Sequence, residues 1–130
     1  MSDNSVKFTE HVYIASSPRG GRGAFVKSDV GISVCLAISL SWELSPEDIK
    51  QVDQTSIEGF WFNHPEKKGW GLLPIGVAAM VNCSLQPNAI LDWTRHELGF
   101  VGHLTTLRPI RADEEILVDY EIGLPHGWIA

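Results

Sequence analysis

The densest group of polar residues is the heptapeptide NCSLQPN, residues 82–88. Asn, Ser and Pro all favour turns, so we expect this segment to be a loop. It directly follows an apolar run from Leu72 to Val81, which indicates that the loop is seated against a core. Buried amides and hydroxyls need hydrogen-bond partners, and a bound ligand would supply some of them.

A second candidate is the turn RGGRG, residues 19–23. Glycine permits positive φ and lets a ligand approach the backbone closely. Short glycine motifs match easily, however, and a flexible hairpin loop with two solvated arginines is favoured on spacing alone. The turn becomes a binding site only if other segments meet it.

Other chemistries receive little support from the sequence. The five histidines lack metal-ligand spacing, and Cys35 and Cys83 are too few for a cysteine-rich zinc cluster, so we predict no metal. A hydrolase is poorly supported, because there is no G-x-S-x-G and Cys83 has no base nearby in the sequence, although partners in space remain open. Residues 21–23 lack the third glycine of a dinucleotide fingerprint.

Length and charge limit the choice of function. At 130 residues the chain fits one domain, and its net charge of −6 argues against direct nucleic-acid binding. The charge suits a basic partner such as a lysine-bearing peptide, or serves solubility alone. No secretory signal is seen, and the apolar run ending at Val81 is too short to span a bilayer. We therefore expect a soluble intracellular protein without membrane contact.

The patterns predict a mostly β domain after a polar tail, residues 1–9, with no alternation of strands and helices. One short helix is expected after Ser45, with Pro46 at its first position and its end before Thr55. The expected strands are His11–Ala15, Ala24–Lys27, Trp70–Leu73, a hairpin of Ala89–Thr94 with Leu98–Leu107, and Glu114–Tyr120.

Two further segments allow more than one interpretation. Residues 32–41 alternate large and small side chains, which predicts a half-buried strand with Cys35 on its small-residue face in a packing role. The run Phe60-Trp61-Phe62 is typical of a core strand with one exposed ring. The alternative for this run is an aromatic-lined channel.

Taken together, three stretches resemble the SET-domain family of protein-lysine methyltransferases. They are RGGRGAFV (residues 19–26), NCSLQPNA (82–89) and LRPIRADEEILVDYE (107–121). These are similar to the family's G-x-G segment, its N-H-S-C-x-P-N loop and its I-x-x-G-E-E-L-x-x-D-Y strand. The resemblance covers about residues 10–121, and the order and separation of the motifs make it specific.

The resemblance implies a β-clip-like fold of small curved sheets with a C-terminal pseudoknot and one or two short helices. The SET domain would span residues 10–121, and residues 122–130 would form a short segment docking on the active site. S-adenosyl-L-methionine would bind on one face, a substrate lysine would enter from the other, and a narrow channel would join them.

Residue roles follow from the same resemblance. Gly21, Arg22 and Gly23 would hold the methionine part of the cofactor, and Asn82 its amino-acid end. Cys83 stands where the family has histidine, beside the adenine. Trp128 would close the site, and Tyr120 matches the active-site tyrosine. Phe60 and Val118 would line the lysine channel.

This chemistry needs a neutral amine. Free lysine has a pKa of about 10.4, so it must lose a proton before it attacks the sulfonium methyl group. A narrow apolar channel disfavours the ammonium form and lowers that pKa. The hydroxyl of Tyr120 would orient the amine. Without the resemblance, Tyr120 is equally a buried strand tyrosine with a satisfied hydroxyl.

The main hypothesis is therefore a lysine methyltransferase acting on a histone or another basic protein. Cys83 motivates an alternative, a SET-like interaction module that has lost catalysis, and a third reading is an unrelated β domain. Stand-alone microbial and viral members of the family lack zinc-binding flanks, as this chain does, and some pair as homodimers, so a dimer stays open. A eukaryotic or viral origin would extend the expected location to the nucleus and chromatin.

Overall fold

The computed structural model describes residues 6–7, 9–57 and 59–119. Within them the chain forms small sheets, one α-helix and one 3-10 helix, which confirms the predicted mostly β class with one or two short helices. The strands are β1 (Val6–Lys7), β2 (Val12–Ser16), β3 (Arg22–Val26), β4 (Cys35–Ser39), β5 (Ser41–Leu44), β6 (Phe62–Asn63), β7 (Gly71–Pro74), β8 (Asn82–Cys83), β9 (Ala89–His96), β10 (Gly99–Thr106) and β11 (Leu117–Val118). The helices are α1 (Pro46–Val52) and η1 (Val77–Ala79).

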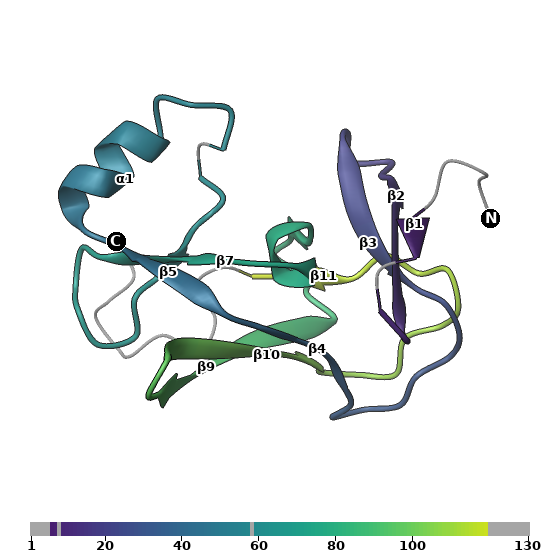
Figure 1. Ribbon diagram of the computed structural model, residues 1–130. Coiled ribbons are helices and arrows are strands. Elements are labelled where there is room, and N and C mark those ends of the chain that lie inside the picture. Colours follow the sequence, from purple (N-terminus) through teal and green to yellow (C-terminus); the bar gives the residue numbers. More distant parts are fainter. Residues whose placement is uncertain (1–5, 8, 58, 120–130) are drawn as a thin grey trace.

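Four small sheets surround one core. Their strand orders are β1-β2-β3, β4-β10-β9, β11-β8 and β5-β7-β6. In Figure 1 the sheet of β1 to β3 stands at one end of the molecule, and α1 with β5 and β7 occupies the other. One hydrophobic cluster contains buried residues from both ends, among them Val12, Phe62, Leu104 and Ile116, so the ends share a continuous interior.

The hairpin β9–β10 is the longest regular element. Its register runs without a break from His96↔Gly99 to Ala89↔Thr106. Gly99 takes φ +109° just after the tip, a conformation that glycine adopts without strain. The hairpin predicted near residues 95–97 is confirmed.

Helix α1 begins where its capping residues predict. Ser45 Oγ accepts from the Asp48 N–H and Asp48 accepts from the Ser45 N–H, each at 3.1 Å, so a capping box closes the first turn. The helix lies over Gly71 of β7, where a Cβ would come 2.8 Å from the Trp61 ring and 3.3 Å from Ile49 Cδ1. Glycine at position 71 therefore lets the helix approach the sheet.

The two late motifs meet at the centre of the fold. Strand β8 pairs in parallel with β11, with Asn82 opposite Leu117 and Cys83 opposite Val118. The Ser84 N–H donates to Val118 O at 2.8 Å and extends this pairing. The continuation of the predicted pseudoknot, like the predicted docking of residues 122–130, falls outside the described residues.

The strand predicted over residues 32–41 differs from the observed one. Ser33 takes φ +61°, so the chain becomes extended only at Cys35. Register shifts between Leu104 and Thr105 of β10, which places a bulge at Leu36. The bulge turns Cys35 outward, and the expectation that Cys35 packs in the interior is wrong, because its side chain is exposed.

The aromatic run 60–62 forms less strand than predicted. Only Phe62 and Asn63 pair, as β6 against β7. Phe62 is buried, Trp61 is half-buried and Phe60 is exposed. The expected single exposed ring is therefore present, and it is that of Phe60.

Candidate functional site

The glycine turn between β2 and β3 is a defined structure. Gly20 and Gly21 take φ +101° and +62°, which suits residues without a Cβ. The Ser17 N–H donates to Gly21 O at 2.9 Å, and the Gly20 N–H donates to Ser17 O at 3.0 Å. The hydroxyl of Ser17 accepts from the Arg19 N–H at 3.0 Å. This turn therefore presents its backbone in one fixed shape.

Asn82 joins this turn to the central sheet. Its Nδ2 donates to Arg22 O at 3.0 Å and to Glu115 Oε2 at 2.7 Å. One amide group thus connects β3, β8 and the segment before β11. The three stretches singled out in the sequence come together at this residue.

Glu115 completes the junction, and the sequence did not point to it as a site residue. Its carboxylate also accepts from the Ser17 hydroxyl, at 2.8 and 3.0 Å. A Cβ on Gly23 would lie 2.4 Å from Glu115 Oε2, so the glycine makes room for this carboxylate. The adjacent acids Glu114 and Glu115, following a turn, are the signal that could have identified it.

Asn88 fastens the second motif to the third from inside the core. Its side chain is 1% exposed. Its Oδ1 accepts from the Leu117 N–H at 2.8 Å, and its Nδ2 donates to Glu115 O at 2.8 Å. The Asn88 N–H also donates to Leu117 O at 3.0 Å. A buried amide in this loop was predicted to need hydrogen-bond partners, and the partners of Asn88 are other residues of the chain. Asn88 therefore positions the loop against residues 115–117.

The turn that leads into Glu115 is fixed by charge. The Arg108 guanidinium donates to Glu114 Oε2 at 2.7 Å, and the Arg111 N–H donates to Oε1 at 3.1 Å. The hydrogen bond from Arg108 lowers the pKa of Glu114 and outweighs the opposing effect of burial. Glu114 is therefore ionised at neutral pH and keeps this turn closed.

Asp113 occupies the position of the family's glycine. It takes φ +67°, the left-handed conformation that this position demands. Its Oδ1 accepts from the Tyr13 hydroxyl at 2.7 Å. Burial, followed by this hydrogen bond, raises the pKa of Tyr13 to about 12. The aspartate therefore supplies a contact that a glycine could not.

A pocket of about 270 Å³ opens beside the Asn82 junction. Four residues predicted for the site lie in its wall: Gly21, Arg22, Asn82 and Phe60. The remaining lining residues are Gly20, Ala79, Met80 and Val81. The last three directly precede the NCSLQPN loop, which is the sequence signal that could have indicated them.

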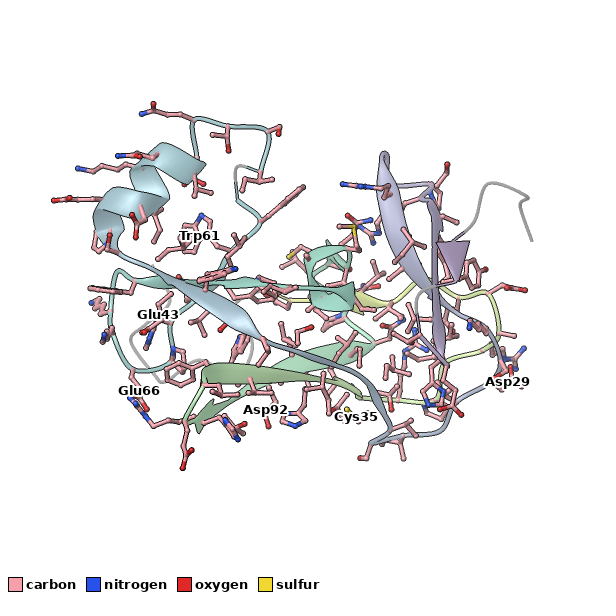
Figure 2. The ribbon with its side chains drawn as sticks, in the orientation of Figure 1. Asp29, Cys35, Glu43, Trp61, Glu66 and Asp92 are labelled. Carbon is pink, nitrogen blue, oxygen red and sulfur yellow. The ribbon has the colours of Figure 1, made fainter. Side chains whose placement is uncertain are left out.

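Phe60 is positioned at this pocket by contacts between its loop and the C-terminal end of α1. Asp53, the C-cap of α1, accepts from the Gly59 N–H and from Trp61 Nε1, both at 3.0 Å. Figure 2 shows Trp61 beneath the helix. The residues on both sides of Phe60 are thereby fixed, and Phe60 lines the pocket together with the glycine turn.

The other predicted residues have different surroundings. Cys83 is exposed and Gly23 adjoins Glu115, and neither lines the pocket. Val118 is fully buried and belongs to the hydrophobic core cluster. Tyr120 and Trp128 lie outside the described residues.

The described part of the chain shows neither a cluster of metal ligands nor a helix that could cross a membrane. No group of three or more His, Cys, Asp or Glu side chains converges there as a metal site. No helix in residues 6–7, 9–57 and 59–119 has the length and apolar character needed to cross a membrane.

Comparison with known proteins identifies the fold. No protein-family model and no curated protein sequence matches the chain. Among solved structures, 186 chains do match. One is the crystal structure of a Plasmodium falciparum putative histone methyltransferase, with a TM-score of 0.68 and 24% identity over 85% of this chain and 96% of that one. At this identity the similarity shows a shared SET-like fold.

Proposed function

We propose that this protein is an S-adenosyl-L-methionine-dependent lysine methyltransferase. The observation that carries the proposal is the single pocket that the glycine turn, Asn82 and Phe60 line together. These residues lie far apart in the sequence, and the SET resemblance assigns Gly21, Arg22 and Asn82 to the cofactor and Phe60 to the lysine channel. The structural neighbour, described as a putative histone methyltransferase, has the same fold.

The chemistry of the pocket fits this cofactor. Arg22 provides positive charge for a carboxylate, and Arg19 stands beside it, donating to Ser84 Oγ at 3.4 Å. The volume of about 270 Å³ is slightly below the roughly 300–1,000 Å³ of small-molecule sites, so the pocket accommodates part of such a molecule. In this proposal, residues 120–130 complete the cofactor site.

When bound, the cofactor supplies an electrophilic methyl group. The protein aligns the amine and keeps it deprotonated, which is worth several kcal/mol of the barrier. Phe60 provides an apolar approach that disfavours the ammonium ion, and the Tyr120 hydroxyl orients the amine lone pair. The Asn82–Glu115 junction keeps the cofactor wall fixed. The net charge of −6 favours encounter with a basic protein such as a histone.

Methyl transfer to core histones from cofactor labelled in the methyl group tests the proposal. We expect label on lysine, identified by mass spectrometry, and loss of label in Tyr120→Phe with cofactor binding kept. Tyr13→Phe, which changes the chain's other tyrosine, is the matched control and should retain labelling. Full activity in Tyr120→Phe would remove the role assigned to that hydroxyl.

We also propose an alternative function, because Cys83 is exposed and stands at the position of the family's histidine. In that case the chain is a SET-like interaction module without catalysis. It predicts no calorimetric signal with millimolar S-adenosyl-L-methionine, whereas the enzyme hypothesis predicts saturable binding. The same titration therefore separates the two functions.

A further inference from the structure

In the segment from Ile38 to Glu43, polar side chains contact the interior and large apolar side chains face solvent. Its polar residues contact the interior: Ser39 is 2% exposed, Ser41 Oγ donates to Phe100 O at 2.8 Å, and Glu43, although its side chain is 42% exposed, places Oε1 2.6 Å from Nε2 of the buried His64. Its alternate residues are large and apolar, and they face solvent. A strand of a monomer normally has the opposite arrangement.

The outward residues form a continuous stripe. Ile38, Leu40 and Trp42 are 65%, 49% and 66% exposed, and their period-two spacing puts them on one face. Ile75, which is 49% exposed, lies beside Leu40, because its N–H donates to Leu40 O at 3.0 Å. We call these four residues the apolar stripe. Apolar surface gathered in this way marks an interaction site.

A second pocket adjoins one end of the apolar stripe. Its volume is about 420 Å³, and Ile38 forms part of its wall. The other walls come from segment 9–11, from residues 35–37 of β4 and from Gly76 and Val77. Figure 2 places Cys35 on this side of the molecule, away from Trp61 and Glu43. The pocket shares no lining residue with the candidate cofactor pocket.

We propose that two copies of this chain associate through their apolar stripes, related by a two-fold axis at Leu40. Trp42 lies four residues from Ile38, roughly 13 Å along an extended chain. With the stripes antiparallel and Leu40 against its own copy, each Trp42 meets the other copy's Ile38 and the pocket beside it. Every chain thus contributes one projecting indole and one pocket, as a closed two-fold interface requires.

Charge supports a second copy as the occupant. The apolar stripe has no ionisable residue, and its neighbour Glu43 is already held by His64 and, at 3.6 Å, by Lys67 Nζ. The net charge of −6 is therefore carried elsewhere and does not oppose contact at this surface. A basic or acidic partner would find no complementary charge on the stripe itself, and among the described residues the adjoining pocket has Glu10 and His11 as its only acidic or imidazole lining residues. Tryptophan seated in a pocket of its partner is also a common energetic centre of protein interfaces.

Sedimentation velocity over a concentration series tests the association. We expect a species of twice the 14.4 kDa chain mass, and we expect Trp42→Glu to raise the dimer dissociation constant on the order of 30-fold or more. Leu85→Glu is the matched control, because Leu85 is 90% exposed in the loop after β8 and belongs neither to the apolar stripe nor to the second pocket. A monomer at every concentration overturns the proposal, as does a dimer that Trp42→Glu leaves intact.

Cross-linking tests the position of the axis. In a Cys35→Ser, Cys83→Ser background, Leu40→Cys should form a disulfide with its own copy under mild oxidation, because a residue on a two-fold axis meets itself. Leu85→Cys in the same background should remain uncross-linked. A dimer that dissociates with Trp42→Glu yet gives no Leu40→Cys cross-link would refute the axis at Leu40. Circular dichroism of each variant verifies that the fold is retained.

Discussion

Asn82 Nδ2 lies 2.7 Å from Glu115 Oε2, and this contact joins the polar loop to the acidic turn that precedes β11. The same nitrogen donates to Arg22 O, so the glycine turn belongs to the junction as well. The candidate cofactor pocket lies directly beside it. The integrity of this junction is therefore the basis of the first three predictions.

Replacing Glu115 by alanine should cost about 2–3 kcal/mol of unfolding free energy. The change removes the acceptor of both Ser17 Oγ and Asn82 Nδ2, and unpaired buried donors are costly. Urea denaturation measures the loss. Glu97→Ala, at the exposed hairpin tip, should stay within about 0.5 kcal/mol of the unaltered protein. Equal stability of the two variants would show that the junction contributes nothing to folding.

Gly23→Ala should destabilise the protein by about 1–3 kcal/mol, because its Cβ would lie 2.4 Å from the Glu115 carboxylate. Gly31→Ala is the matched control, since a Cβ there has no atom within 4 Å. A double-mutant cycle with Glu115→Ala should show coupling, because removing the carboxylate relieves the clash. Strictly additive effects would contradict this explanation of Gly23.

Asn88→Ala should lower stability by about 3 kcal/mol, since it leaves the Leu117 N–H and Glu115 O without side-chain partners in the core. Gln86→Ala, at an exposed position of the same loop, should be nearly neutral. Thermal unfolding of both variants makes the comparison. If Asn88→Ala were as stable as Gln86→Ala, Asn88 would not fasten the two motifs together.

Tyr13 should titrate with a pKa of about 12, because burial and the hydrogen bond to Asp113 both oppose ionisation. Its folded-state pKa lies above the unfolded value of about 10. Its contribution to stability is therefore complete below pH 10 and is lost as pH rises through about 12. Ultraviolet titration of tyrosinate measures this. With only two tyrosines in the chain, Tyr13→Phe isolates the signal of Tyr120.

A Tyr13 signal at the ordinary value would contradict the contact with Asp113. Asp113→Asn provides a further check, because it removes the carboxylate charge while keeping an acceptor oxygen. We expect it to lower the pKa of Tyr13 but to leave it above the ordinary range, since burial is the largest cause of the shift.

For Glu43 we expect the opposite dependence: its contribution to stability should be lost at acid pH. The hydrogen bond with His64 lowers its pKa, so its contribution is present above the unfolded value of about 4.3 and is lost as pH falls through the folded value. The stability difference between the unaltered protein and Glu43→Gln should therefore be larger at pH 7 than at acid pH. A difference independent of pH would show that the carboxylate charge does not act through His64.

Much of the fold could be predicted from local signals. Ser45 and Pro46 identified the helix start, and the residues around Arg95 identified the long hairpin, because caps and turns are determined by neighbouring residues. The alternation of residues 32–41 predicted a strand but could not say which face is buried. That choice depends on the bulge at Leu36 and on β10, which is distant in the sequence.

The candidate site was predictable only in part, because short motifs are visible in the sequence and contacts between distant segments are not. Resemblance of short motifs singled out Gly21, Arg22 and Asn82, and the lysine channel implied by the family resemblance pointed to Phe60; all four line the pocket. Glu115 was missed because its importance comes from Ser17 and Asn82, contacts that only the folded chain creates. Tyr120, which the mechanism requires, remains a prediction.

The central claim is that S-adenosyl-L-methionine occupies the pocket beside Asn82, and amide chemical-shift mapping of the labelled protein tests it most directly. We predict that titration with the cofactor shifts the amides of Gly20–Arg22, Phe60 and Ala79–Asn82, and that Asn82→Ala weakens the response. The amides of residues 9–11 and 35–38, around the second pocket, should remain unshifted. No shifts at millimolar cofactor, or shifts confined to the second pocket, would contradict the account.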